Sequence, residues 1–495
     1  MLVGRVDEIG VNNDYFINPQ TVKKFDGGSL YGISNSFPTE KWEDYIGLVK
    51  ILGVFPYEEG SSLQSGDPKC RKNVQRPAFP GKPGNKVFVL DGDDLWDFLG
   101  INSDGLNLGT LEHYNIDVKI NLNRLINKHF AVLAMSGAGK SYLISVILEE
   151  LLLRSKSIGT PGILLIDVHG EYKFLSDQSI QENRHFAMKT TYYDGRYFQI
   201  DVSSLSAFDF ASYQPNMSNA QVRDLKKIIE KIRTSRKTSE NGAAPSVPGS
   251  SLPDKKDSAA ASAGKSYDLN DLIAYIDLEP DVNQKVREAL VGWLYDLERL
   301  ELFTSTEMPL TRSIIKPGHL TILDLSNVVS IRKKQIIVAH LAEKLFYMRR
   351  TGSIPPFLMI LEEAHQFAPE SQPGESAIAK NIIETIAREG RKFFAQICLI
   401  SQRPVKLSTT ALSQCNTHII LRVTNPNDLN HIKQSSEALT NETLKMIATL
   451  PTGNALVMGS ATNLPLFIKI RQRFTTDPLG EKNLEEICRQ YQLPE

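Results

Sequence analysis

The sequence has few cysteines, almost no net charge and no long hydrophobic run. Only 4 of its 495 residues are cysteine, and none form a CxxC pair, so a zinc ribbon, a thioredoxin-type site and a disulfide scaffold are disfavoured. The 56 Lys and Arg residues nearly balance the 57 Asp and Glu residues. This balance disfavours a free-standing histone-like DNA binder. It leaves a local basic channel open, because partner choice follows the distribution of charge.

Segments for membrane insertion or secretion are also lacking. The apolar runs have the length of strands and carry charges, and none reaches the ~18 residues that a membrane helix needs. The N-terminus, MLVGRVDEIGVNNDYF, has no basic segment followed by an apolar stretch and does not read as a secretory signal. Few, scattered cysteines suit a reducing compartment. We therefore expect a cytoplasmic protein with no membrane partner.

What is present suits an ordinary globular chain of about three domains, with 41% apolar and 23% charged residues. Residues 1–120 are rich in turn-forming residues between short apolar pieces, which predicts a small β-barrel or sandwich. The pattern changes near residue 128, where HFAVLAM, ISVILEELLLRS and GILLIDV alternate as strand, helix and strand. A βαβ unit of this kind predicts an α/β fold with a parallel sheet covered by helices.

The α/β pattern is interrupted and then resumes, so we expect a core made of residues 121–204 and 313–475. Further buried parallel strands are expected at 319–328, 356–363, 395–402, 417–423 and 454–459, with an edge strand at 463–473. The residue pattern of 205–312 is typical of helices and predicts a helical insertion. Within it, residues 238–266 are rich in Ser, Ala, Gly and Pro, which is typical of a flexible linker. We expect residues 476–495 to be a C-terminal tail.

The strongest motif is AMSGAGKS at residues 134–141, which matches the phosphate-binding P-loop pattern G-x4-G-K-[ST] except for Ala134 at its first position. It follows an expected strand and opens an expected helix, as the pattern requires. Its backbone N–H groups and the helix N-terminus would bind phosphate, Lys140 would reach the β- and γ-phosphates, and Ser141 would bind Mg²⁺. The residues expected to bind ATP are Ser136, Gly137, Ala138, Gly139, Lys140 and Ser141.

Hydrolysis also needs an acid for the metal and a base for water, and three expected strands end in acids. Glu362 and Glu363 are adjacent, so Glu362 could hold Mg²⁺ while Glu363 polarises the attacking water. Asp167, on the strand after the P-loop helix, is the alternative, and Asp324 ends a third strand. An extra strand usually separates the P-loop strand from the acid strand in motor ATPases, which favours the Glu pair.

Two further signals are weaker. Gln402 ends an apolar strand, from where its amide could contact the γ-phosphate or the water. Arg388 and Arg391 lie one helical turn apart in AREGRK. They could form a solvated helix face, or one of them could be an arginine finger offered to a neighbour's nucleotide.

The order of the motifs resembles the HerA branch of the HerA–FtsK superfamily of P-loop DNA-pumping ATPases, and the resemblance covers nearly the whole chain. The motifs are AMSGAGKS, DVHGEY (167–172), LEEAH (361–365), AREGRK (387–392), SQRP (401–404) and LRVTNPND (421–428). Val168 stands where Pro is usual in the family. Glu362 stands where many members have Asp, and either carboxylate can hold magnesium.

The resemblance implies a RecA-like motor core with an N-terminal β-barrel and a helical insertion, assembled as a homohexamer that threads double-stranded DNA. It places Lys140, Ser141, Glu362, Glu363 and Gln402 in the nucleotide site. By the same resemblance Arg388, or less directly Arg391, is the finger that acts on the next subunit. Family members work with effector subunits, such as a NurA-like nuclease in DNA end processing or a sirtuin-like NADase in anti-phage defence.

Two other functions remain to be weighed against a DNA translocase. A ring that binds ATP mainly to assemble effector subunits would share every nucleotide-binding residue, although Glu363 and the finger favour turnover. A P-loop kinase is disfavoured by the Glu pair and Gln402. A motor needs only phosphate contacts to hold DNA, and the basic residues that follow two of the motifs are candidates for them: Lys173, Arg403 and Lys406.

Overall fold

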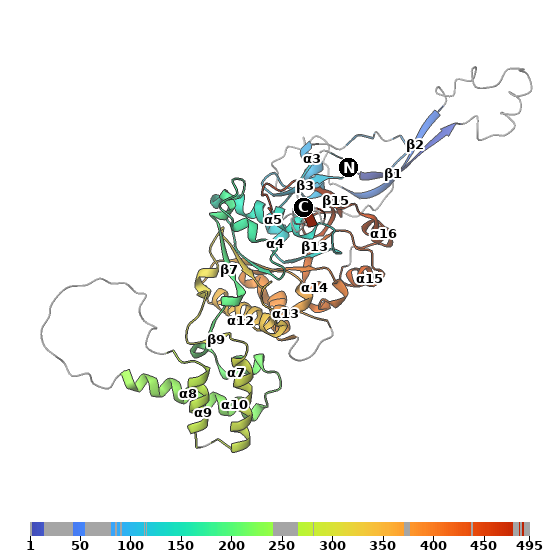
Figure 1. The fold of residues 1–495 in the computed structure, drawn as a ribbon. Helices are drawn as coiled ribbons and strands as arrows, with labels where there is room; N and C mark the ends of the chain where they lie inside the picture. The colour runs from blue at the N-terminus through green and yellow to red at the C-terminus, as the bar shows by residue number, and fades with distance from the viewer. Residues whose placement is uncertain are drawn as a thin grey trace, which may run out of the picture. The chain divides into compact units, whose positions relative to one another are not determined.

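The chain divides into two compact units, Met1–Ile101 and Asn102–Glu495 (Figure 1). The structure is a computed structural model. It describes residues 2–13, 43–54, 81–84, 87–89, 92–112, 114, 116–240, 266–280, 282–370, 377–436, 439–478, 485 and 488–489.

The described part of the first unit contains one antiparallel pair of strands and one helix. Strand β1 (Leu2–Asn13) pairs with β2 (Glu43–Val54), and helix α3 spans Gly92–Leu99. The pairing shifts register after Val3 and again after Val6, as β-bulges do. Most residues of the expected β-barrel lie outside the described ones, so the barrel stays a prediction.

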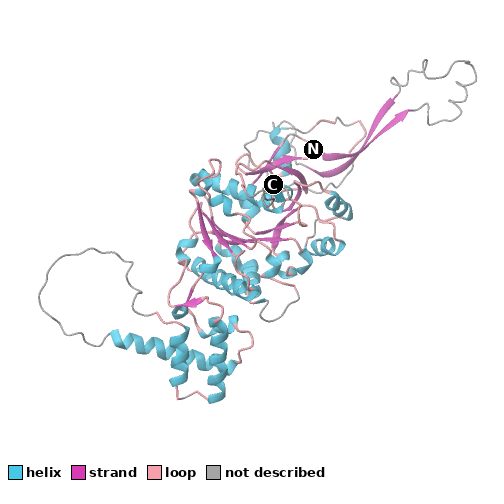
Figure 2. Ribbon diagram, viewed as in Figure 1, coloured by secondary structure: helices cyan, strands magenta, loops and turns pink. Residues whose placement is uncertain are grey.

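The second unit is built on an eleven-stranded sheet, counted over the described residues, in the order β4-β3-β15-β14-β13-β5-β12-β11-β6-β10-β7 (Figure 2). The run from β13 to β7 is parallel. Its strands are β5 (His129–Leu133), β6 (Gly162–Asp167), β7 (Thr190–Asp194), β10 (Leu320–Asp324), β11 (Phe357–Leu361), β12 (Ala395–Ser401) and β13 (Cys415–Ile420). The antiparallel strands are β3 (Leu106–Leu111), β4 (Asp117–Ile120), β14 (Asn454–Gly459) and β15 (Leu466–Ile470).

The mixed α/β fold with a parallel sheet is as predicted, but the antiparallel side of the sheet is not. Strand β14 was expected to be parallel and pairs antiparallel with β13. Strand β15 was expected at an edge and lies between β14 and β3. Strands β3 and β4 fall within residues 1–120 and extend this sheet. The residue pattern of a short apolar stretch shows which side chains lie on the same face of a sheet. It does not show which strand the stretch pairs with or in which direction.

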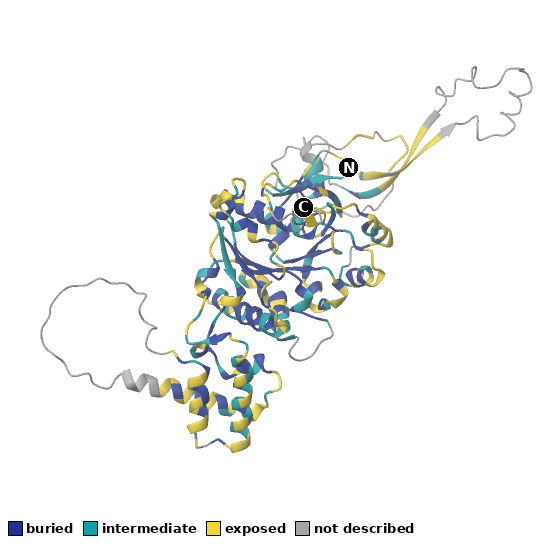
Figure 3. Ribbon diagram, in the orientation of Figure 1, coloured by how far each residue is buried: buried dark blue, intermediate teal, exposed yellow. Residues whose placement is uncertain are grey.

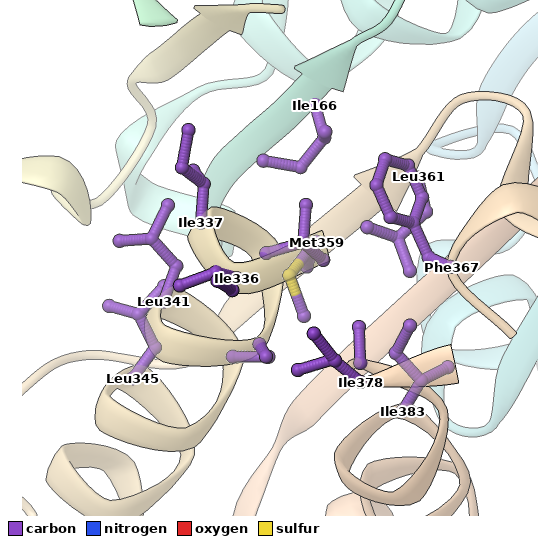
Figure 4. Close-up of a cluster of buried hydrophobic side chains, with 14 of the residues drawn as sticks. Ile166, Ile336, Ile337, Leu341, Leu345, Met359, Leu361, Phe367, Ile378 and Ile383 are labelled. Carbon is purple, nitrogen blue, oxygen red and sulfur yellow. The ribbon is translucent and has the colours of Figure 1, made fainter. Parts of the chain in front are cut away.

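Buried residues follow the parallel strands (Figure 3), and both faces of the sheet are covered by helices (Figure 1). Helix α5 (Lys140–Leu153) lies on one face, and α12 (Ile331–Arg350), α13 (Lys380–Glu389) and α14 (Thr409–Ser413) lie on the other. Met359 and Leu361 of β11 point toward Ile336 of α12 and Ile383 of α13 (Figure 4). Since side chains alternate along a strand, a sheet that is buried on both faces requires the continuous apolar runs seen in the sequence.

The range expected to be helical, 205–312, contains most of the helices that interrupt the core. They are α7 (Ala207–Tyr213), α8 (Asn219–Glu240), α9 (Leu269–Leu278) and α10 (Gln284–Glu298), with α11 (Thr311–Ile314) and the short pair β8 (Ile200–Asp201) and β9 (Phe303–Thr304) beside them. Ser206 and Asp268 begin α7 and α9 with capping boxes. The linker expected at 238–266 lies outside the described residues except at its two ends.

The remaining helices of the second unit are short. They are α4 (Leu122–Ile126), α6 (Arg184–Ala187), α15 (Pro426–Ser435) and α16 (Asn441–Thr449). Most of the tail expected at 476–495 lies outside the described residues. Over the described chain, no helix combines the length and the apolar character that crossing a membrane requires.

Candidate functional site

The P-loop joins the end of β5 to the start of α5. Gly137 and Gly139 have φ angles of 73° and 96°, in the left-handed region that glycine adopts most readily. Ala134 is fully buried and is not among the described non-glycine residues with positive φ. A methyl group is therefore tolerated at the first position, where the motif usually has glycine. The N-terminus of α5 faces this loop, as in other anion sites.

The paired glutamates meet the P-loop lysine in a buried cluster. Strand β12 separates β5 from β11, so the residues after β11 lie at the same edge as the P-loop. The Nζ of Lys140 donates to Oε1 of Glu363 at 2.9 Å and to Oε1 of Glu362 at 3.3 Å. Burial alone would lower the pKa of Lys140, but the two carboxylates outweigh it and the pKa is raised. Lys140 therefore stays charged where a nucleotide's phosphates would bind.

Glu363 occupies an unusual backbone conformation. Its φ of 47° and ψ of 45° are left-handed, and such a conformation in a non-glycine residue costs of order 1–3 kcal/mol and is often found at functional sites. The carboxylate lies 3.2 Å from Nδ1 of His365 and 3.8 Å from Nε2 of His169. Burial lowers the pKa of His365. The strain and these neighbours aim the Glu363 carboxylate into the P-loop region.

Asp167 organises the loop that follows β6. Its carboxylate accepts hydrogen bonds from four successive backbone N–H groups, those of His169, Gly170, Glu171 and Tyr172, at 2.7–3.2 Å. Burial and the neighbouring Glu362 carboxylate raise its pKa. Because its oxygens serve this loop while Glu362 and Glu363 contact Lys140, the geometry favours the Glu pair for catalysis.

Oxygen atoms suited to a divalent cation gather beside Lys140. Oε2 of Glu362 accepts from the N–H of Val168 at 2.9 Å, which ties β11 to the loop after β6. The hydroxyl of Ser141 donates to the carboxylate of Glu171 in that same loop. Mg²⁺ prefers oxygen ligands and takes only one or two carboxylates when nucleotide phosphates supply the rest. Ser141 and Glu362 therefore fit the metal role expected of them.

Gln402 follows β12 and so lies at the same edge, between the P-loop strand and the Glu pair. The Ser401 hydroxyl accepts from the N–H of Arg403 at 3.0 Å and lies 3.2 Å from Nδ1 of His365. Asp428, from the LRVTNPND motif, accepts from the N–H of Val405 at 3.0 Å. These contacts fix the loop that carries Gln402 beside the acids.

Comparison with known proteins shows what the chain is similar to. Residues 106–345 match the family profile described as the helicase HerA, central domain. The DNA double-strand break repair helicase HerA of Pyrococcus furiosus is 28% identical over 474 residues, which cover 86% of this chain and 78% of that protein. The protein of the same name from Sulfolobus acidocaldarius is 27% identical over 407 residues, covering 80% and 74%. Over most of its length the chain is therefore similar to proteins named HerA helicase.

The fold agrees with this similarity. The structure of VirB4 of Thermoanaerobacter pseudethanolicus superposes with a TM-score of 0.54 at 13% identity, over 76% of this chain and 98% of that one. At this identity the likeness concerns the fold alone. The HerA-type chain is an ATP hydrolase of the translocase and helicase type, as the motif order predicted.

The basic residues that were predicted to contact DNA lie at the carboxyl edge of the parallel sheet, beside the P-loop. Lys173, in a 3-10 turn (Lys173–Ser176), lies 5.4 Å from the ring centre of Tyr192. Arg403 and Lys406 are exposed at the end of β12. Their role in DNA binding stays a prediction.

Arg388 and Arg391 lie at the opposite edge. Arg388 lies in the last turn of α13, and Arg391 lies in the 3-10 turn Gly390–Phe393 that leads into the start of β12. Because β12 runs parallel to β5, residues before β12 are at the amino edge of the sheet, whereas the P-loop is at its carboxyl edge. Both arginines are exposed. The fold does not bring either into its own chain's P-loop.

Several site residues escaped the sequence analysis. Glu171, His365 and Asp428 all belong to motifs quoted there, but nothing in their spacing shows that they contact Ser141, Glu363 or the Gln402 loop. A further contact joins distant segments: Arg471 donates to the fully buried Glu149 of α5 at 2.8 Å. Apart from the contact between His365 and Glu363, which are neighbours in the sequence, these contacts join segments at least 23 residues apart.

Proposed function

We propose that the chain is an ATP-driven motor on double-stranded DNA that works as a homohexamer. The relatives named above are DNA double-strand break repair helicases, which supports DNA as the substrate. The observation that carries the proposal is the division of the hydrolysis machinery. The Lys140–Glu362–Glu363 cluster is complete within one chain, while the arginines that could complete it lie exposed at the other edge of the sheet.

Each residue of the cluster has a distinct role in this proposal. Lys140 binds the β- and γ-phosphates, and Glu363 orients the attacking water and accepts its proton. Ser141 and Glu362 hold Mg²⁺, which when bound neutralises charge on the phosphates. Gln402 contacts the γ-phosphate or the water and relays the state of the site to the loop that carries Arg403.

The missing cation would come from a neighbouring subunit. A positive charge on the transferred phosphoryl group is worth ~10³–10⁵ in rate when an arginine finger supplies it in trans. Arg388, with Arg391 as the alternative, would supply this charge across a head-to-tail interface. Since head-to-tail interfaces close into rings when the rotation allows, this assignment and the hexamer support each other.

The motor would serve an effector subunit. The family resemblance supports a NurA-like nuclease in DNA end processing or a sirtuin-like NADase in anti-phage defence, and the names of the relatives support the repair role. A ring scaffold with little translocation would use the same nucleotide contacts. The position of Glu363 against Lys140 favours turnover over such a scaffold.

The ATPase rate with and without double-stranded DNA tests the proposal. Wild type should hydrolyse ATP faster with duplex DNA, and Glu363→Gln should bind ATP without cleaving it. Glu182→Gln removes an exposed carboxylate outside the site and should behave as wild type. A wild-type rate that is unaffected by duplex DNA, with strand separation absent, would leave the scaffold as the better description.

A further inference from the structure

Glu171 contacts the P-loop, although the proposed mechanism of hydrolysis gives it no role. Its carboxylate accepts a hydrogen bond from the hydroxyl of Ser141, the P-loop side chain that binds the metal in proteins of this class. Glu171 comes from the loop after β6, and its own N–H donates to Asp167 at 3.2 Å. The loop that Asp167 organises therefore delivers a carboxylate to the metal-binding hydroxyl.

The carboxylates around this contact form a region of negative charge in which a cation would be favoured. Glu362 and Glu363 accept hydrogen bonds from Lys140, and the carboxylate of Glu171 also acts to raise the pKa of that lysine. Asp167 lies next to Glu362, since the N–H of His169 donates to both at 3.2 Å. Burial lowers the pKa of half-buried Lys334, although the carboxylates of Asp324, Glu362 and Asp167 act against this, so a second lysine lies near the same acids. Like charges at close range oppose ionisation, and a divalent cation would offset them. Burial, and after it the carboxylates of Glu362, Asp167 and Glu171, raise the pKa of the Tyr172 hydroxyl well above its usual value.

We propose that Glu171 is a second acidic residue of the Mg²⁺ site. In the structure Glu171 holds the Ser141 hydroxyl. When Mg²⁺ and nucleotide bind, Glu171 would release that hydroxyl to the metal and help to hold the cation by its negative charge. This inference rests on the proposed function only in taking the P-loop as the nucleotide site. It assigns to the DVHGEY motif a role in metal binding, through Glu171, and a role in positioning, through Asp167.

A carboxylate in this position couples metal and nucleotide binding. In the absence of Mg²⁺ its negative charge opposes the phosphates, and in the presence of Mg²⁺ it favours the metal-bound nucleotide. Coupling of this kind is a ratio of two affinities and can be measured without hydrolysis. A residue that only holds the P-loop in shape would weaken both affinities together.

The test is the affinity of the full-length chain for ADP, measured by calorimetry with Mg²⁺ and again with a chelator. For Glu171→Gln we expect the Mg²⁺-dependent gain in ADP affinity to fall by about 10-fold or more, since outer partners of metal sites typically contribute 10–100-fold. ADP affinity in the chelator should be unchanged or higher. Glu182→Gln is the matched control, and Glu362→Gln shows the size of the effect for the expected metal residue.

Two results would overturn the assignment. If Glu171→Gln keeps the wild-type gain while Glu362→Gln loses it, Glu362 alone supports the metal. If Glu171→Gln binds ADP more weakly by the same factor with and without Mg²⁺, Glu171 only shapes the P-loop. Failure of the proposed motor would look different, because it would leave the ADP measurements intact and abolish the response of the ATPase to duplex DNA.

Discussion

The two edges of the parallel sheet differ in how they use charge. At the carboxyl edge, Lys140, Glu362 and Glu363 are buried and bonded to one another. At the amino edge, Arg388 and Arg391 are exposed. One edge thus has a catalytic cluster that a single chain can assemble, and the other has cations that a single chain does not direct to its own nucleotide. The proposed sharing of one active site between neighbouring subunits would account for this difference.

The largest effect is expected from Lys140→Ala at the carboxyl edge. The change removes the charge that binds the β- and γ-phosphates and leaves two buried carboxylates without their lysine. Steady-state ATPase should fall to background and nucleotide affinity should drop. Lys156→Ala, an exposed lysine in a 3-10 turn (Lys156–Ile158), should retain wild-type hydrolysis. Wild-type turnover by Lys140→Ala would show that phosphate binds elsewhere.

Glu363→Gln and Asp167→Asn together decide which acid acts at that edge. Glu363→Gln should trap ATP uncleaved in a single-turnover assay, because the amide keeps the shape but cannot accept the water's proton. Asp167→Asn should lower the rate less, by disturbing the loop after β6, and should also lower thermal stability. The opposite ranking, with Glu363→Gln active and Asp167→Asn inactive, would move the base to β6.

A buried histidine at the amino edge of the sheet should make the stability of the fold depend on pH, with an effect of moderate size. His129, at the start of β5, accepts from the N–H of Ile397 at 2.9 Å, and burial lowers its pKa to about 4. The unfolded chain, with a histidine pKa near 6.5, binds the proton more readily. Stability supplied by neutral His129 is therefore present above pH 6.5 and is lost as pH falls toward 4, by about 2 kcal/mol at pH 5.

Urea unfolding at pH 7 and pH 5 checks this effect. His129→Gln should lose less stability on acidification than wild type, although it starts from a lower value at pH 7. His185 is exposed, so His185→Gln serves as the control. It should lose as much stability between pH 7 and pH 5 as wild type does. An unchanged pH dependence in His129→Gln would mean that other groups carry the acid sensitivity.

The local motifs could be predicted from the sequence, and the contacts between them could not. The P-loop and the Glu pair are each a short local pattern at the end of one strand, β5 and β11 respectively, so AMSGAGKS and LEEAH were enough to predict roles for Lys140 and Glu363. The pairing of β15 with β3 joins segments more than three hundred residues apart in the chain. The Ser141–Glu171 contact likewise depends on how two loops meet at one edge. Which edge carries Arg388 follows only from the parallel order of the strands.

Mixing two inactive variants tests most directly whether neighbouring subunits share one active site. Arg388→Ala should assemble and bind ATP but hydrolyse it ~10³-fold or more slowly, because the finger is missing. Combined with Glu363→Gln in equal amounts, about one interface in four would join an intact Glu363 to an intact Arg388 across a head-to-tail contact. The account predicts that the mixture recovers ATPase activity which neither variant has alone. A mixture as inactive as its parts, with mixed rings confirmed by native mass spectrometry, would contradict it.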